Sequence, residues 1–485
     1  MEISKYLILL MMVIYTFECF SVFGYHDAYT KMWILRRQSI WIFMIHFLAF
    51  LTLFLRMQEA RILVFYVIQV ALLGSIILLY GFLYPKVSRL VVNNMCMLLA
   101  VGFIMLTRLT YNNAVKQVII VAASGVISLF VPVIIRKARF LSRLKLVYAV
   151  VGVAALAAVI VVGRVSNGAM LGFEVAGISV QPSELVKIVF VFFVASSLYR
   201  AKDFRNVVIT TIVAALHVLI LVASTDLGAA LIVFVVYLVM LYVATRQPLY
   251  IAAGVGAGSV ASVAAYFLFS HVRTRVTVWR DPFAVYNEGG YQVAQSLFAI
   301  GTGGWFGLGL CQGLPDKIPV VTTDFIFSAI AEELGAVFAI CIILICVSCY
   351  IMFLNIAMQL RDSFYKLVAL GLGTCYIFQV FLAIGGVIKF IPSTGVTLPL
   401  VSYGGSSLLS TMIMFAIIQG LYILREDEEE DIERQRERQL RAKRRRQAQQ
   451  TGRPRSNGTR PPAGAPSGDR RRNSKNRNSQ RVRRP

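Results

Sequence analysis

Charged side chains are scarce in this chain: they make up 15% of its 485 residues, against 58% that are hydrophobic. A water-soluble globule of this composition could not cover its apolar surface, so the composition excludes a soluble domain. Apolar runs recur as far as residue 424, and each is about the length that crosses a bilayer core of roughly 30 Å. Because backbone polar groups cannot stay unpaired in lipid, these runs are helices. The sequence therefore predicts an all-α polytopic membrane protein.

We expect thirteen membrane spans. The first has no small-residue cleavage site after it, so we interpret it as a span and not as a signal peptide. The thirteen are Tyr6–Phe23, Ser39–Leu55, Ile62–Tyr84, Asn93–Leu106, Gln117–Ile135, Leu146–Val162, Leu185–Tyr199, Val207–Ala223, Leu227–Val243, Leu249–Phe269, Phe325–Leu354, Tyr365–Phe390 and Leu408–Leu424.

Basic residues lie in alternate connections, for example at 136–145 and 200–205. Positively charged loops tend to stay in the cytoplasm, so this pattern predicts an outer amino terminus and a cytoplasmic carboxyl-terminal tail. Three connections then open on the outer face: Arg164–Glu184, the long loop His271–Thr323, and Pro392–Ser407.

Cysteine and histidine are also few. Nearly all seven cysteines fall inside predicted helices, where we expect them to act as small apolar residues. Cys346 and Cys349 form a C-x-x-C, but a redox role is not expected inside a lipid-spanning helix. The four histidines have no metal-ligand spacing, so zinc is not indicated.

Much of the net charge of +24 lies after Leu424. "REDEEEDIERQRERQLRAKRRRQAQQ" predicts a charged helix, with Glu430/Arg434 and Glu437/Arg441 at supporting i,i+4 spacing. The Pro, Gly, Ser, Asn and Arg that follow predict disorder. The tail either holds the carboxyl terminus in the cytoplasm or binds anionic lipid head groups or an acidic partner. It has no aromatic residues for base stacking, which argues against nucleic acid.

Ionisable residues in or beside spans are costly and mark candidate function. "QPSELVK" begins a helix at Pro182 and sets Glu184 and Lys187 on one face. These two form either an internal ion pair that pins helices together or a substrate contact. In "STDLGAAL", Asp226 begins the next helix, and capping alone would explain it.

The His271–Thr323 loop is long, and loops of this length are more often functional than not. "HVRTRVTVWRDPF" supplies Arg273, Arg275 and Arg280, whose guanidinium groups match phosphate oxygens. Further on, 292–300 is amphipathic, and we expect 301–309 to form a glycine-rich turn that lets a ligand approach the backbone.

"TTDFIFSAIAEELG" closes this loop. We expect Thr322 or Thr323 to cap a helix and to leave Asp324 in its first turn, where the helix dipole keeps the carboxylate ionised.

Two more carboxylates follow, and helical geometry puts Glu332 deeper than that aspartate and Glu333 on the opposite side. We expect Glu332 to line the interior and to meet Lys187, Lys389 or a polar backbone segment. The stretch "KFIPSTGVTLPLVSYGGSSLLS" interrupts two apolar runs, and non-helical backbone at that depth must pack on protein or line a cavity. It predicts part of a re-entrant wall.

The segments "QPSE", "GYQ…QSL.AIG.GG..G.GL", "TDFIF…EELG" and "STGVTLPLVSYGGSS", in this order, closely resemble the signatures of the SEDS (shape, elongation, division and sporulation) family, which includes RodA, FtsW and SpoVE. The resemblance covers about 93–424, which holds ten of the thirteen spans, the family's usual number. It implies a core in 93–424, and it leaves outside the family pattern the three extra helices expected in 1–92 and the cytoplasmic charged helix and basic tail expected in 425–485.

Members of that family are peptidoglycan glycosyltransferases. The resemblance implies polymerisation of lipid II at the outer face of the bacterial cytoplasmic membrane, with a class B penicillin-binding transpeptidase, during elongation, division or sporulation. Other elongation or division proteins are further potential partners. The family's essential aspartate falls in the motif that Asp324 occupies here.

Glycosidic bond formation requires the acceptor's 4-hydroxyl to lose a proton as it attacks the donor's anomeric carbon, so Asp324 is the expected general base. Cations must stabilise the departing lipid pyrophosphate, and a divalent cation could share that task, with no other cofactor expected. The candidate cationic residues are Arg273, Arg275, Arg280, Lys317 and Lys187, and the wider candidate substrate-binding set adds Glu184, Gln292, Gln295, Glu332, Ser402, Gly404 and Gly405.

Two other functions remain open. A lipid II flippase could use Glu184, Lys187, Glu332 and Lys389 as a polar path, although these residues gather toward one face. A scaffold whose tail recruits division or elongation proteins is the other alternative.

Overall fold

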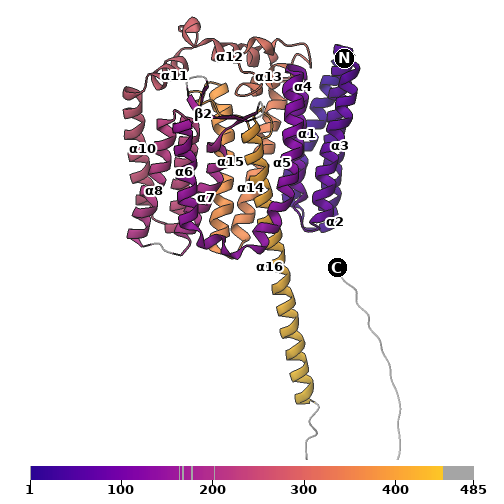
Figure 1. Cartoon of the computed structure of the whole chain (residues 1–485). Helices are drawn as coiled ribbons and strands as arrows, with labels where there is room; N and C mark the ends of the chain where they lie inside the picture. The colour runs from indigo at the N-terminus through magenta and orange to yellow at the C-terminus, as the bar shows by residue number, and fades with distance from the viewer. Residues whose placement is uncertain (1, 163, 167–168, 176–177, 201–202, 452–485) are drawn as a thin grey trace, which may run out of the picture. The chain divides into compact units, whose positions relative to one another are not determined.

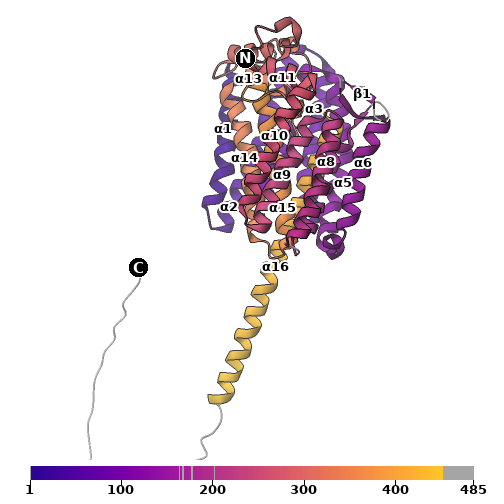
Figure 2. The same cartoon turned by 90° about the vertical axis from the view of Figure 1, so that its left-hand side faces the viewer.

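A computed structural model describes residues 2–162, 164–166, 169–175, 178–200 and 203–451. The chain forms one compact unit, Met1–Glu429, and a second unit, Glu430–Pro485. In the first unit the long helices run side by side as a bundle (Figures 1 and 2). Its long helices are α1 (Glu2–Gly24), α2 (Ala28–Met57), α3 (Ala60–Leu83), α4 (Arg89–Leu109), α5 (Tyr111–Lys137), α6 (Lys145–Val162), α7 (Pro182–Leu198), α8 (Phe204–Ala223), α9 (Leu227–Thr245), α10 (Pro248–Leu268), α14 (Ala336–Gln359), α15 (Ser363–Val387) and the start of α16 (Gly405–Thr451).

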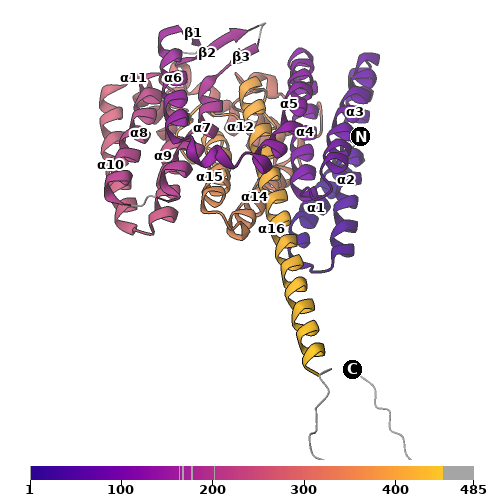
Figure 3. The same cartoon turned by 60° about the horizontal axis from the view of Figure 1, so that its bottom comes forward.

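The prediction of an all-α membrane protein is confirmed. Within the described residues, eleven of these helices are long and apolar enough to cross a membrane, and α6 and α7 are shorter. Twelve of the thirteen predicted spans each correspond to one helix, although some helices begin earlier than predicted, as α2 does at Ala28 instead of Ser39. The Arg164–Glu184 connection contains three short antiparallel strands in the order β1-β2-β3: β1 (Arg164–Ser166), β2 (Ala169–Val175) and β3 (Ile178–Val180) (Figure 3).

The predicted span Phe325–Leu354 is wrong as a single helix. The structure divides it at Gly335 into the short α13 (Ile326–Leu334) and α14. Gly335 has φ +92°, and a Cβ there would lie 2.6 Å from the carbonyl oxygen of Trp305. The chain therefore turns where only glycine fits, and the acidic pair near the end of α13 precedes the long helix.

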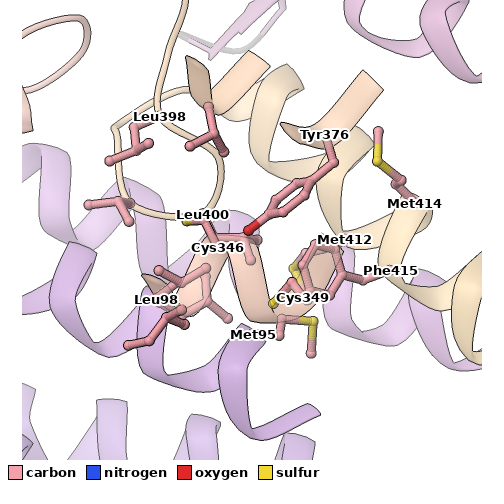
Figure 4. Close-up of a cluster of buried hydrophobic side chains, with 14 of the residues drawn as sticks. Met95, Leu98, Cys346, Cys349, Tyr376, Leu398, Leu400, Met412, Met414 and Phe415 are labelled. Carbon is pink, nitrogen blue, oxygen red and sulfur yellow. The ribbon is translucent and has the colours of Figure 1, made fainter. Parts of the chain in front are cut away.

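At the centre of the bundle, α4 is buried along its whole apolar window, which explains why it is apolar on nearly all sides. Figure 4 shows part of the core around it, where Met95 lies beside Cys349 of α14, and Tyr376 of α15 and Phe415 of α16 belong to the same cluster. All seven cysteines are free, and most are buried, as expected of small apolar residues.

The amino-terminal helices join this core through hydrogen bonds. The hydroxyl of Tyr15 in α1 donates to Asn94 Oδ1 of α4 at 2.9 Å, and Asn94 Nδ2 donates to Ser348 Oγ of α14 at 3.3 Å. Ser39 in α2 donates to Asn93 Oδ1 at 3.0 Å. Polar side chains buried in a membrane bundle are satisfied by one another, so these bonds fix how α1 and α2 sit on the core.

In the second unit, α16 continues as the predicted charged helix. Arg434 pairs with Glu430, and Arg441 lies 3.6 Å from Glu437, as the i,i+4 spacing indicated. The stretch predicted to be disordered lies, after Thr451, outside the described residues.

Candidate functional site

Three short helices gather at one end of the bundle (Figures 1 and 2). These are α11 (Ser270–Arg280), α12 (Tyr291–Gly303) and α13. Residues of the first two helices and of the segments next to them line a pocket of about 320 Å³. Its walls come from α11, α12, the turn before α13 and the segment that follows α15. The polar and charged side chains that line it include Arg275, Gln292, Asp324 and Lys389, and its apolar ones include Val278 and Ile391.

Asp324 lies in a turn and not in a helix. Its amide donates to the carbonyl of Val320 at 3.2 Å, and α13 begins only at Ile326, with Phe325 as an N-cap that makes no side-chain capping bond. The prediction that a threonine caps the helix and leaves Asp324 in its first turn is therefore wrong. The hydroxyl of Thr323 donates back to Val320 at 3.0 Å, so it is engaged in the turn.

The segment 388–404 holds that turn in place. The amide of Tyr403 donates to the carbonyl of Thr322 at 2.8 Å, and the hydroxyl of Ser402 donates to the carbonyl of Thr323 at 2.5 Å. The segment is non-helical and packs against protein, as predicted: a Cβ on Gly102 of α4 would lie 2.7 Å from the carbonyl oxygen of Val401. The glycine in α4 thus lets the segment enter the bundle.

Arg275 and Asp324 face a common space beside Gly395. Arg275 Nη1 donates to the carbonyl of Ser393 at 3.0 Å, which orients the guanidinium. A Cβ added to Gly395, which has φ +72°, would lie 3.6 Å from Asp324 Oδ2 and 3.9 Å from Arg275 Nη2. The absence of a side chain at Gly395 therefore leaves room for a small group between the carboxylate and the guanidinium.

Burial and the neighbouring charges shift the pKa values of Asp324 and Arg275 in opposite directions. Burial raises the pKa of Asp324 above its usual value, and Arg275 and the Thr323 hydroxyl offset part of that rise. Burial also lowers the pKa of Arg275, with Asp324 and Asp226 acting in the opposite direction. The group that favours the ionised form of Asp324 is therefore the guanidinium of Arg275, and not the helix dipole that was expected. A carboxylate whose pKa is raised by burial is suited to accept a proton.

Several predicted substrate-binding residues lie outside the pocket. Gln295 donates to the hydroxyl of Tyr286 at 2.8 Å. Arg273, Arg280 and Lys317 are exposed. None of these four side chains lines the pocket.

The internal ion-pair interpretation of Glu184 and Lys187 is confirmed. Lys187 Nζ lies 2.9 Å from Glu184 Oε2 and donates to Gln379 Oε1 at 2.8 Å, and both charged residues are buried. Nearby, Asp226 caps α9 by accepting from the amide of Ala229 at 3.1 Å, which the sequence predicted. This cluster joins helices beside the pocket and does not line it.

Part of the predicted glycine-rich turn is filled by the protein itself, whereas Gly301 and Gly304 face open space, so the approach of a ligand to the 301–309 backbone stays a prediction. A Cβ on Gly303 would lie 2.1 Å from the carbonyl oxygen of Ala331, and one on Gly307 would lie 2.4 Å from that of Glu333. These glycines admit the chain's own α13 backbone. Glu332 accepts from the amide of Leu314 at 2.8 Å, which is the polar backbone partner among the three alternatives expected.

Gly404 and Gly405 lie where α16 begins, and neither lines the pocket. Sequence reasoning did not single out Gly395 or Trp279. The Trp279 indole donates to the carbonyl of Lys389 at 3.2 Å and helps close the wall. Trp279 lies in the segment that was noted for its arginines, and Gly395 lies in the segment that interrupts two apolar runs. The glycine in "STGV" was the one sequence feature that could have indicated a close approach of other groups to the backbone there.

Among the described residues, no group of three or more His, Cys, Asp or Glu side chains could hold a metal ion. Asp324 is the one carboxylate among the described residues that line the pocket. A divalent cation here would therefore take its other oxygen ligands from backbone carbonyls, water or a bound phosphate group.

Comparison with known proteins identifies the class. The family described as "Cell cycle protein", which groups FtsW, RodA and SpoVE, matches residues 83–426. This chain belongs to that family.

Among curated relatives, the chain is 38% identical over 271 residues to the peptidoglycan glycosyltransferase RodA of Mycobacterium tuberculosis (strain H37Rv), covering 52% of this chain and 57% of that protein. It is 33% identical over 272 residues to the probable peptidoglycan glycosyltransferase FtsW of Tolumonas auensis, covering 54% and 71%. The chain thus spans little more than half the length of the RodA relatives.

Solved structures share the fold. One, described as "Structural coordination of polymerization and crosslinking by a peptidoglycan synthase complex", has a TM-score of 0.60 at 24% identity and covers 70% of this chain and 98% of that one. The rod shape determining protein RodA of Thermus thermophilus has a TM-score of 0.52 at 23% identity, covering 70% and 97%.

Proposed function

We propose that this protein is a peptidoglycan glycosyltransferase that polymerises lipid II into glycan strands. The observation that carries the proposal is the pocket in which the Asp324 carboxylate and the Arg275 guanidinium flank the open space beside Gly395. The relatives named peptidoglycan glycosyltransferase support the reaction class.

In the proposed reaction, the acceptor's 4-hydroxyl lies next to Asp324 Oδ2. Its oxygen attacks the donor's anomeric carbon while the proton passes to the carboxylate, which acts as general base. The bond from the anomeric carbon to the pyrophosphate oxygen breaks, and a single displacement inverts the configuration. A pKa raised by burial brings the carboxyl closer to the pH at which it must accept a proton.

The departing lipid pyrophosphate carries negative charge, and Arg275 is the proposed group that stabilises it. Its guanidinium is held by the carbonyl of Ser393, so the charge is oriented before substrate binds. Lys389 and Gln292 line the same pocket and are proposed to contact the substrate. Asp324 is the pocket carboxylate that would hold a divalent cation; such a cation would supply further positive charge for the leaving group, and activity before and after chelation tests for it.

The setting proposed for this reaction is the bacterial cytoplasmic membrane. The alternation of basic loops supports a pocket on the outer face and a tail in the cytoplasm. A class B penicillin-binding transpeptidase is the proposed partner, and membrane lipids surround the bundle. The proposed division is into extra helices at 1–92, a catalytic core at 93–424 with an outer loop at 271–323, and a tail at 425–485.

A flippase is less well supported. The polar path it needs would join Glu184, Lys187, Glu332 and Lys389. The first two bond to each other, and Glu332 bonds to the backbone of Leu314. Side chains satisfied within the protein offer a passing head group few free partners.

The decisive experiment is glycan-strand synthesis from labelled lipid II by the full-length protein with its transpeptidase partner. We expect polymer from the wild type and a loss of roughly 10²- to 10⁴-fold in Asp324→Asn, the usual contribution of a general base. The matched control is Asp281→Asn, because Asp281 is exposed, lies outside the pocket and accepts from the amide of Phe283. Asparagine can accept the same bond, so this variant should stay active.

The unfolding temperature of Asp324→Asn shows whether a loss of activity comes from lost chemistry or from lost folded protein. Because the pKa of Asp324 is raised in the folded state, its ionised form is disfavoured there, and the cost is present at neutral pH. Asp324→Asn should therefore unfold at the same temperature as the wild type or higher. Equal polymer from the wild type and from Asp324→Asn would remove Asp324 as the base. No polymer from either, with lipid II still crossing vesicle membranes, would favour the flippase.

A further inference from the structure

The position of α13 bears directly on the pocket. The helix follows Asp324 with only Phe325 between them, and all nine of its residues are buried. Any shift of α13 is transmitted through one residue to the carboxylate.

The acidic pair of α13 is held from two sides. The side chain of Glu333 has 0% exposure, and its Oε1 lies 3.1 Å from Arg108 Nε near the end of α4. Arg108 also donates to the carbonyl of Gly313 at 3.4 Å and lies 3.6 Å from Asp316 Oδ2. On the other side, Glu332 accepts from the amide of Leu314. One arginine thus connects the central helix, α13 and the loop before it.

The loop fits around the end of α13 closely. A Cβ on Gly313 would lie 2.9 Å from Glu332 Cδ and 3.0 Å from Glu333 Cγ. The amides of Leu308 and Gly309 donate to the carbonyls of Glu332 and Glu333 at 3.0 and 2.8 Å. The 307–314 loop therefore encloses the end of α13, and Arg108 contacts both the loop, at Gly313, and the helix, at Glu333.

Stability alone does not explain a buried ion pair here. Replacing such a pair by neutral groups of similar size is often neutral for folding, because the desolvation of both charges offsets their attraction. What a charged, directional contact supplies is one defined arrangement of the elements that it joins.

We propose that the Arg108–Glu333 ion pair positions the catalytic carboxylate, by fixing α13 against α4 so that Asp324 stays beside Arg275. Arg108 and Glu333 are positioning residues and touch no substrate. This inference rests on the proposed function, since its effect is on the reaction assigned to Asp324.

The test compares full-length wild type with Arg108→Gln, Glu333→Gln and the double variant that carries both changes. Arg108→Gln leaves the buried charge of Glu333 unpaired, and Glu333→Gln leaves Arg108 with only the exposed Asp316, so each single variant should lose stability. The double variant removes both charges and should unfold close to the wild-type temperature. Lys116→Gln is the matched control, because Lys116 is an exposed cation near the start of α5.

In the double variant we expect kcat for lipid II polymerisation to fall roughly ten- to a hundredfold, the usual size for a small misplacement of a catalytic group, with KM unchanged. A second readout separates positioning from a simple loss of folded protein. The other charged side chains that line the pocket are Arg275 and Lys389. If Asp324 moves away from Arg275, it loses the interaction that lowers its pKa, and the acidic limb of the kcat profile shifts to higher pH.

Two results overturn the inference while leaving the proposed function in place: a double variant with wild-type kcat, or a kcat that falls only with the folded fraction and an unmoved acidic limb. A wild type that makes no polymer under these conditions refutes the proposed function itself, and with it the positioning role.

Discussion

Gly395→Ala tests the space between the two charged groups of the pocket. With φ +72°, an L-residue at this position costs about 1–2 kcal/mol of backbone strain. The added methyl would lie 3.6 Å from Asp324 Oδ2 and 3.9 Å from Arg275 Nη2, which are ordinary van der Waals distances. No steric overlap adds to the strain, so the expected loss of folding free energy stays at about 1–2 kcal/mol.

The effect on activity should be much larger than the effect on stability. In the proposed reaction, the methyl would occupy the place where the acceptor hydroxyl comes within hydrogen-bond reach of the carboxylate, and displacing that hydroxyl by about 1 Å should cost roughly 10²-fold in rate. The assay is polymerisation of labelled lipid II at saturating substrate, with thermal unfolding measured on the same preparations.

The control for backbone strain is Gly304→Ala. Gly304 also has a positive φ, of +57°, but a Cβ there would meet nothing within 4 Å. It should lose stability and keep its rate per folded molecule. If Gly395→Ala polymerises lipid II at the wild-type rate, the acceptor does not approach through this space, and the site geometry argued above is refuted.

Two further predictions concern charge and the amino-terminal helices. In Arg275→Gln, the acidic limb of the kcat profile should move to higher pH, because the guanidinium that lowers the pKa of Asp324 is gone; an unmoved limb would show that the two groups do not interact. In Asn94→Leu, the buried Tyr15 hydroxyl loses its acceptor, so we expect the unfolding free energy to fall by about 1–3 kcal/mol, and partial recovery in a Tyr15→Phe background; full stability of Asn94→Leu alone would contradict the role of this contact.

Local patterns in the sequence predicted much of the fold and part of the site. Apolar runs located the helices, because lipid forces the backbone to bond within each segment. The i,i+3 spacing of Glu184 and Lys187 indicated an ion pair as one of two alternatives, and Asp226 was expected as a cap. These features depend on neighbours within a few residues or on one helix face.

Other features depended on contacts between distant segments. Asp324 was expected in a helix, but the partners that hold its turn come from the 402–403 backbone and side chain, far along the chain. Arg108 was not singled out at all, because its partner Glu333 is 225 residues away. Hydrophobic periodicity and local spacing do not predict an ion pair between residues so far apart in the sequence.

The sequence by itself determined that this chain is a bundle of membrane helices with its ionisable residues gathered in a few motifs, since hydropathy and local spacing are properties of the segment alone. Tertiary structure decided which of those residues share a pocket. Arg275 and Asp324 meet beside Gly395 while Arg273, Arg280 and Lys317 do not line it. The reason is that side-chain direction and the entry of the 388–404 segment are set by packing among helices that are distant in sequence.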